Sequence, residues 1–217
     1  NQLANQLINQ STPFIGTFHS LGAKILRKDG KFFGRTIGFT IYDSDDSLRV
    51  IKGIIKNFNL DSKKYSAPQM QRKFSAIKSE LIDFDENFNN EYDTTIRALF
   101  NEYELALKNN NAFDFDDLIE KVVRVFRESP LVLKKYQKDI NHVLVDEYQD
   151  INTAQYHFVR LLAQKHNNIS VVGDDQQSIY KFRFSDFRNF LNFDRDWPDA
   201  KVVLLEQNYR STGNIIK

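Results

Sequence analysis

The fold class follows from one stretch of the chain, Asn141-His142-Val143-Leu144-Val145-Asp146-Glu147-Tyr148-Gln149-Asp150. Three aliphatic residues followed at once by two carboxylates indicate a buried strand. Such a strand delivers acidic side chains to the carboxyl edge of a parallel sheet, where open α/β folds bind their ligands. Acidic residues also follow strands as turn formers or helix caps, so this stretch alone leaves both interpretations open.

Two further apolar runs continue the pattern towards the C-terminus. Residues 169–173 predict a second buried strand, which ends in Asp174-Asp175-Gln176-Gln177-Ser178, and residues 201–205 predict a third, which ends in Glu206-Gln207-Asn208-Tyr209-Arg210-Ser211. Between the first two strands, Asn152 is a good N-cap for an amphipathic helix. Strands that alternate with helices favour a parallel sheet with crossover helices, so the polar strand ends should meet at one edge.

The N-terminal part predicts a strand over Pro13–Phe18 that runs into a helix from His19. Thr17, His19 and Ser20 therefore lie together at a strand-to-helix junction. Hydroxyl and imidazole groups at such a junction can bind phosphate, but a plain helix cap is the commoner role of Ser and Thr there. The local sequence favours the cap.

From about Tyr42 to Asn111 the chain has the character of successive helices. Asp43 and Ser44 are good caps for the first helix, a second is expected near residues 69–80, and Thr94 or Thr95 precedes a third. We expect an all-helical block with no catalytic constellation. Residues 112–119 are then expected to begin another amphipathic helix.

Composition limits the class of protein. The 217 residues are 41% hydrophobic and 13% aromatic with a net charge of +1, which is sufficient for a packed core and leaves no bulk charge to attract nucleic acid. The absence of cysteine excludes disulfides and thiolate sites. No apolar run approaches the roughly 20 residues of a membrane span, so the cytoplasm is the expected location.

The chain begins without Met and stops at Lys217 inside an expected helix, so we interpret it as a piece of a longer protein.

Asp146, Glu147, Gln177 and Arg210 are the residues expected at the sheet edge, and together they suit cleavage of a phosphoanhydride. One carboxylate can hold Mg²⁺, the second can accept a proton from water, the amide can orient that water, and the guanidinium can offset phosphoryl charge. No G-x-x-x-x-G-K-[ST] loop occurs in the 217 residues, so the usual phosphate cradle is missing.

A second cluster alternates aromatic and basic residues over 178–184. Tyr180, Phe182 and Arg183 could form a stacking platform for single-stranded bases. Core packing is the competing interpretation, and without further evidence it is favoured in a chain with 19 Phe.

Five segments resemble consecutive motifs of the UvrD/Rep/PcrA-type superfamily 1 DNA helicases, in family order and with family-like spacing. They are Gly16–Ser20, Phe113–Leu118, Val145–Asp150, Val172–Tyr180 and Leu205–Ser211. The resemblance implies a translocase that uses ATP and Mg²⁺ to move 3′ to 5′ on single-stranded DNA. Its expected partners are single-stranded and junction DNA and the remaining helicase domains, and no interaction with a membrane is expected. It also implies a RecA-like domain 1A, a partial P-loop NTPase fold, over 1–35 and 113–217, with an inserted helical subdomain 1B over 36–112.

The resemblance also implies roles for single residues. Asp146 would bind Mg²⁺ through water with Glu147 beside it as general base, and Gln177 would sense the γ-phosphate. Tyr209 would stack on the adenine and Arg210 would contact the γ-phosphate. The expected DNA contacts are Thr17 and His19 on the backbone, and Tyr180, Phe182 and Arg183 along the base-stacking track.

Some positions depart from the family pattern. Gln176 replaces an acidic residue, Phe182 stands where an aromatic residue, often Trp, is expected, and Phe184-Ser185 replaces a small Gly-Ala pair. The family's phosphate loop and its second RecA-like domain are not in the 217 residues, so we expect this chain alone to be inactive as an ATPase.

Two other functions remain open at this point. One is a non-catalytic module of the same fold that only binds single-stranded nucleic acid. The other is a carboxylate-metal nuclease that uses Asp146, Glu147 and Asp150. Against the nuclease, no lysine or histidine lies within the cluster Asp146–Asp150.

Overall fold

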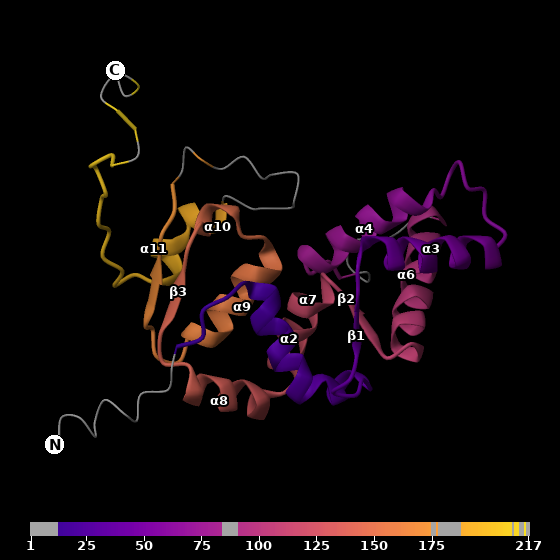
Figure 1. Cartoon of the computed structure of the whole chain (residues 1–217), viewed down its shortest axis with the longest axis horizontal. Helices are drawn as coiled ribbons and strands as arrows, with labels where there is room; N and C mark the ends of the chain where they lie inside the picture. The colour runs from indigo at the N-terminus through magenta and orange to yellow at the C-terminus, as the bar shows by residue number, and fades with distance from the viewer. Residues whose placement is uncertain are drawn as a thin grey trace.

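The computed structural model describes residues 13–83, 91–174, 177, 188–209, 211, 212 and 215, and Figure 1 gives the arrangement of its elements. The fold is mixed α/β, with short parallel strands and many helices. None of the helices in the described part of the chain is both long and apolar enough to cross a bilayer.

The described strands form two parallel pairs. Strand β3 (Val143–Val145) pairs with β4 (Ile169–Val171), and Val145 lies opposite Val171. Strand β1 (Thr40–Tyr42) pairs with β2 (Ala112–Asp114). Between β3 and β4 the chain forms helix α9 (Thr153–Ala163), the crossover that a parallel pair requires. The parallel β3–β4 unit predicted from the sequence is therefore confirmed.

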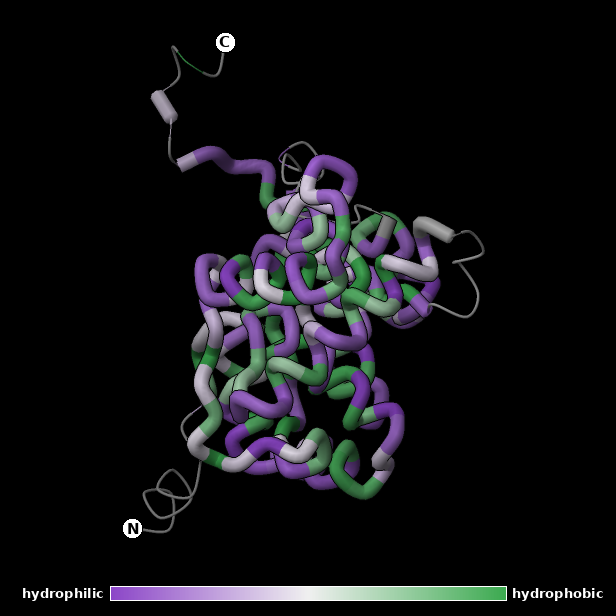
Figure 2. Tube along the Cα trace, turned by 90° about the vertical axis from the view of Figure 1, so that its right-hand side faces the viewer, coloured by the Kyte–Doolittle hydropathy of each residue, from purple (hydrophilic) through white to green (hydrophobic). Residues whose placement is uncertain are grey.

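The helices surround two main hydrophobic cores, one on each side of Figure 1. Helices α2 (Phe18–Asp29), α7 (Asp117–Glu128), α8 (Pro130–Asp139) and α9 supply one core. Helices α3 (Ser44–Asn57), α4 (Ala67–Ser79) and α6 (Glu91–Asn109) supply the other. A smaller cluster lies under β3 and β4, beside the short helices α10 (Arg188–Leu191) and α11 (Phe193–Asp196). Figure 2 shows hydrophobic and hydrophilic residues alternating along the helical turns, as amphipathic packing requires.

Local sequence signals set several helix starts as predicted. The Asp43 carboxylate accepts hydrogen bonds from the backbone N–H groups of Asp45 and Asp46 at the start of α3. Asn152 forms a capping box with Gln155 at the start of α9. Thr17 accepts from the Ser20 backbone N–H and caps α2, so the cap interpretation of this residue is confirmed.

Two predicted elements near helix starts are wrong. Residues 13–17 form no strand, and α2 begins at Phe18 because Thr17 caps it there and Phe18 packs against the core. Residues 112–114 form strand β2 instead of a helical turn. The Asp114 carboxylate accepts from the Asp117 backbone N–H, so α7 starts only at Asp117. The stretch 36–112 is consequently not all-helical, since β1 lies near its start and β2 begins at its end.

The predicted burial of the apolar runs is also partly wrong. Val145 is 6% exposed, but Leu144 is 76% exposed because alternate strand residues point to opposite faces and the described core covers one of them. Residues 201–205 form no strand, and Val202 to Leu205 are 74% to 85% exposed. A continuous apolar strand needs a hydrogen-bonding neighbour and cover on both faces, which the described residues do not supply to this segment.

Candidate functional site

The carboxyl ends of β3 and β4 bring polar side chains to one edge of the sheet. Because the two strands are parallel and in register at Val145 and Val171, their following residues leave on the same side. Asp146 and Glu147 follow β3 with exposed side chains, and Asp174 follows β4. The predicted convergence of the first two strand ends is thus present in the structure.

Glu147 has an unusual backbone. Its φ of 51° lies in the left-handed region, which is uncommon for residues other than glycine. The short 3₁₀ helix η2 (Tyr148–Asp150) follows, and the Tyr148 N–H donates to the Val172 carbonyl at 2.9 Å. Tyr148 is 1% exposed. Burial and this hydrogen bond hold the strained turn, and strain of this kind is concentrated at functional positions.

Gln149 joins the two strand ends and was missed by the sequence reasoning. Its side chain is 1% exposed; its amide Nε2 donates to Glu147 Oε2 at 2.7 Å, and its Oε1 accepts from the Asp174 N–H at 3.2 Å. Gly173 allows this path, because a Cβ there would lie 2.8 Å from Gln149 Oε1. The only sequence signal was its position two residues after the second carboxylate.

Gln177 lies beside this arrangement. Its exposed side chain donates to Asp174 Oδ2 at 2.5 Å, and its backbone N–H donates to the Asp174 carbonyl at 3.3 Å. Asp174 in turn is held by Gln149. Glu147 and Gln177 are therefore connected through a continuous set of polar contacts across the two strand ends.

The structure does not bring the third predicted strand end to this edge. Tyr209 is 85% exposed, and its hydroxyl donates to Gln207 at 2.8 Å. In Figure 1 the segment that carries it, yellow near the C-terminus, runs apart from β3. Arg210 lies outside the described residues, as do Tyr180, Phe182 and Arg183.

The chemistry of the strand ends suits a water-rich metal site better than a cage of protein ligands. Within the described ranges, no group of three or more acidic or histidine side chains could hold a metal ion. Burial and the neighbouring Glu147 raise the pKa of Asp150. The exposed Asp146 carboxylate is an available anionic oxygen ligand, which fits Mg²⁺ that keeps most of its waters.

A second candidate site lies at the start of α2. The His19 ring stacks on Phe115 with centroids 3.8 Å apart and planes at 22°. Phe113 is fully buried in β2, while Phe115, in the turn that follows the strand, is 55% exposed. Burial lowers the pKa of His19 to about 4, so its imidazole is neutral at pH 7. Phe115 was missed by the sequence reasoning, which expected a helix here.

Comparison with known proteins shows which family and which proteins the chain is similar to. Residues 1–198 match the family described as UvrD/REP helicase N-terminal domain. ATP-dependent DNA helicase PcrA of Bacillus subtilis (strain 168) is 43% identical over 207 residues, which cover 94% of this chain and 28% of that protein. PcrA of Leuconostoc citreum is 40% identical, and PcrA of Staphylococcus aureus (strain Mu50 / ATCC 700699) is 42% identical, each over 206 residues with the same coverage. The chain thus spans 28% of the length of these curated relatives.

Proposed function

Because the chain belongs to the UvrD/REP helicase family and matches its N-terminal domain, we propose that it is part of an ATP-dependent DNA helicase that moves 3′ to 5′ on single-stranded DNA. The observation that carries the proposal is the strand-end arrangement in which Gln149 fixes Glu147 and Asp174. The partners of the whole protein would be single-stranded and junction DNA, and the rest of its helicase domains.

We further propose that the part with β3 and β4 is a RecA-like domain 1A, formed by residues 1–35 and 113–217. Residues 36–112 would be the inserted subdomain 1B. The separate hydrophobic core of α3, α4 and α6 supports this division, since a domain has a core of its own.

In the proposed reaction, Glu147 accepts the proton of the water that attacks the terminal phosphate of ATP, and Gln149 holds one oxygen of that carboxylate in place. Asp146 would hold Mg²⁺, which when bound neutralises charge on the phosphates. Gln177 lies at the same edge and would sense the γ-phosphate. Arg210 would contact the γ-phosphate and Tyr209 would stack on the adenine. For Tyr209 this requires its segment to take a different position from the exposed one described above.

For DNA we propose a surface that starts at Thr17 and His19 and includes Phe115. An exposed phenyl ring backed by a neutral imidazole offers a flat apolar face to a base. Tyr180, Phe182 and Arg183 would continue the track.

A charge-neutral substitution of Glu147 tests the ATPase role. In the full-length protein, Glu147→Gln should keep ATP binding while turnover falls by about 10²- to 10⁴-fold, because the base is lost and the shape is kept. The matched control is Glu102→Gln on the exposed side of α6, which should turn over ATP normally. Near-normal hydrolysis by Glu147→Gln would place the base elsewhere.

This chain by itself should not hydrolyse ATP, because its 217 residues lack the G-x-x-x-x-G-K-[ST] loop. A phosphate-release assay with single-stranded DNA checks this. Turnover by the chain alone would refute it, and an inactive full-length protein would favour a module that only binds nucleic acid.

A further inference from the structure

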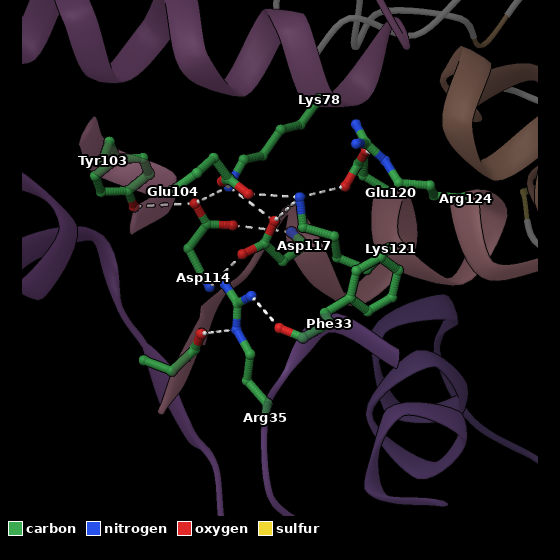
Figure 3. A network of polar contacts seen from close by, with 11 residues as sticks. Phe33, Arg35, Lys78, Tyr103, Glu104, Asp114, Asp117, Glu120, Lys121 and Arg124 are labelled. Atoms are coloured by element: carbon green, nitrogen blue, oxygen red, sulfur yellow. Dashed lines mark hydrogen bonds and ion pairs between the residues drawn. The ribbon is translucent and has the colours of Figure 1, made fainter. Parts of the chain in front are cut away.

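A cluster of charged side chains joins α4, α6 and the start of α7 (Figure 3). We call it the charge cluster; its members are Lys78, Glu104, Asp114, Asp117, Glu120 and Lys121. Charged groups are seldom removed from water unless they are paired, and removing one partner of such a pair is strongly unfavourable. None of these residues belongs to the proposed ATP site, so the cluster needs a separate explanation.

Lys78 is the centre of the contacts that cross between helices. Its side chain is 1% exposed and its Nζ lies 2.7 Å from Asp114 Oδ2, 2.8 Å from Asp117 Oδ1 and 2.7 Å from Glu104 Oε1. A lysine ammonium has three N–H donors, so three carboxylates match its capacity. Burial alone would lower the pKa of Lys78, but these carboxylates outweigh it and hold the pKa well above its usual value.

The two aspartates divide their oxygens between Lys78 and the turn that leads from β2 to α7. Asp114 Oδ1 accepts from the Asp117 N–H at 2.8 Å, and Asp117 Oδ2 accepts from the Asp114 N–H at 3.1 Å. The other oxygen of each carboxylate faces Lys78. The Tyr103 hydroxyl of α6 also donates to Asp114 Oδ2, at 2.9 Å. The same two side chains therefore close the turn and anchor it to the helical block.

Phe115 lies inside this turn. The reciprocal hydrogen bonds between residues 114 and 117 fix the backbone on both sides of it, and its exposed ring stacks on His19. Without Lys78, the Asp114 and Asp117 carboxylates would face each other with less compensation, although Lys121 remains 3.4 Å from Asp117. Like charges at short range repel, and relief requires either a proton or movement of the turn.

We propose that Lys78 is a positioning residue that holds the Asp114–Asp117 turn from helix α4 and thereby sets the orientation of Phe115 towards single-stranded DNA. The proposal rests on the DNA surface proposed above. Under this proposal, helices α4 and α6 contribute to DNA binding without contacting the DNA at this point, because they act on the Asp114–Asp117 turn through buried ion pairs. A purely structural role of Lys78 would lower stability without acting through Phe115.

A double-mutant cycle in the full-length protein separates the two roles. Binding of a fluorescent oligodeoxythymidine is measured for the wild type, Lys78→Met, Phe115→Ala and the double variant. Each single substitution should weaken binding about tenfold, the size expected when one base loses an aromatic stacking partner. The double variant should bind no more weakly than the singles, since both changes remove the same contact. Additive losses of about a hundredfold would overturn the proposal.

Two further variants distinguish a loss of DNA binding from a loss of folding in this double-mutant cycle. Lys56→Met removes an exposed lysine from α3 of the same block and should bind DNA normally. When binding is measured at pH 8, where Asp117 is ionised, Lys78→Met combined with Asp117→Asn removes one charge of each sign, so the net charge of the cluster is preserved. Thermal unfolding should show this variant folded, and it should still bind DNA about tenfold more weakly. Wild-type binding by the folded, charge-balanced variant would overturn the role of Lys78.

The outcome for Phe115 identifies which proposal fails. If Phe115→Ala alone has no effect on DNA binding, the proposed DNA surface is wrong and the role of Lys78 falls with it. If Phe115→Ala weakens binding but Lys78→Met does not, the DNA surface stands and only the positioning role is refuted.

Discussion

At the scale of single residues, the neutral state of His19 decides what this side chain can contribute to DNA binding. Burial lowers its pKa to about 4, so the folded imidazole carries no charge near pH 7 and releases no counterion from DNA. His19→Gln in the full-length protein should therefore weaken DNA binding without changing its dependence on salt. Binding isotherms across a salt series give the slope.

A change of about one in that slope would show a charged His19 contact and contradict the pKa. The same pKa has a consequence for stability. With the folded pKa below the unfolded value of 6.5, the contribution of His19 is present above about pH 6.5 and is lost as the pH falls towards about 4. An NMR titration of the His19 ring in this chain should give a midpoint near 4.

At the scale of elements, the close contact between α2 and α7 requires a glycine at position 22. A Cβ at Gly22 would overlap the Leu118 carbonyl oxygen, which belongs to backbone and cannot turn aside. Gly22→Ala should therefore destabilise the chain by about 1–3 kcal/mol, because α2 would have to move away from α7. Urea unfolding monitored by circular dichroism measures the loss.

Gly53 offers the opposite case and serves as the matched control. It lies inside α3, and a Cβ there meets nothing within 4 Å. Gly53→Ala should stabilise the chain by about 0.5–1 kcal/mol, because alanine loses less backbone entropy in a helix. If both substitutions had the same sign, the close approach of α2 and α7 would be wrong.

At the scale of the whole molecule, the charge cluster makes stability depend on pH. Burial, with the Asp114 and Glu104 carboxylates, raises the pKa of Asp117 from 3.8 to about 7. Between pH 3.8 and about pH 7, Asp117 is therefore protonated in the folded chain but ionised in the unfolded chain. The contribution of this group to stability therefore falls as the pH rises from about 4 to about 7 and then levels off.

Asp117→Asn should remove this dependence. The free energy of unfolding of the wild type, relative to Asp117→Asn, should decrease between about pH 4 and about pH 7. Asp199→Asn, at an exposed position, should show no such trend against the wild type. A wild-type to Asp117→Asn difference that does not vary with pH would mean that Asp117 is ionised throughout.

Local patterns in the sequence were sufficient for the elements whose causes are local. The aliphatic run before Asp146 and Glu147 predicted β3, and the caps Asp43 and Asn152 predicted the starts of α3 and α9. These features depend on neighbours a few residues away, which a single sequence displays. The two carboxylates of the candidate site followed from the same pattern.

Contacts between distant residues decided the rest. Asp114 ends strand β2 and closes the turn before α7, and its carboxylate pairs with Lys78, 36 residues earlier, where the sequence predicted the start of a helix. Gln149 reaches Asp174 across 25 residues, so its role at the strand ends could not be deduced from its neighbours. The sequence by itself determined which residues could form strands, caps and acidic strand ends, because periodicity and capping act within one turn or strand. Only the tertiary structure decided which carboxylates are buried, paired or exposed, because burial and charge pairing depend on where distant segments meet.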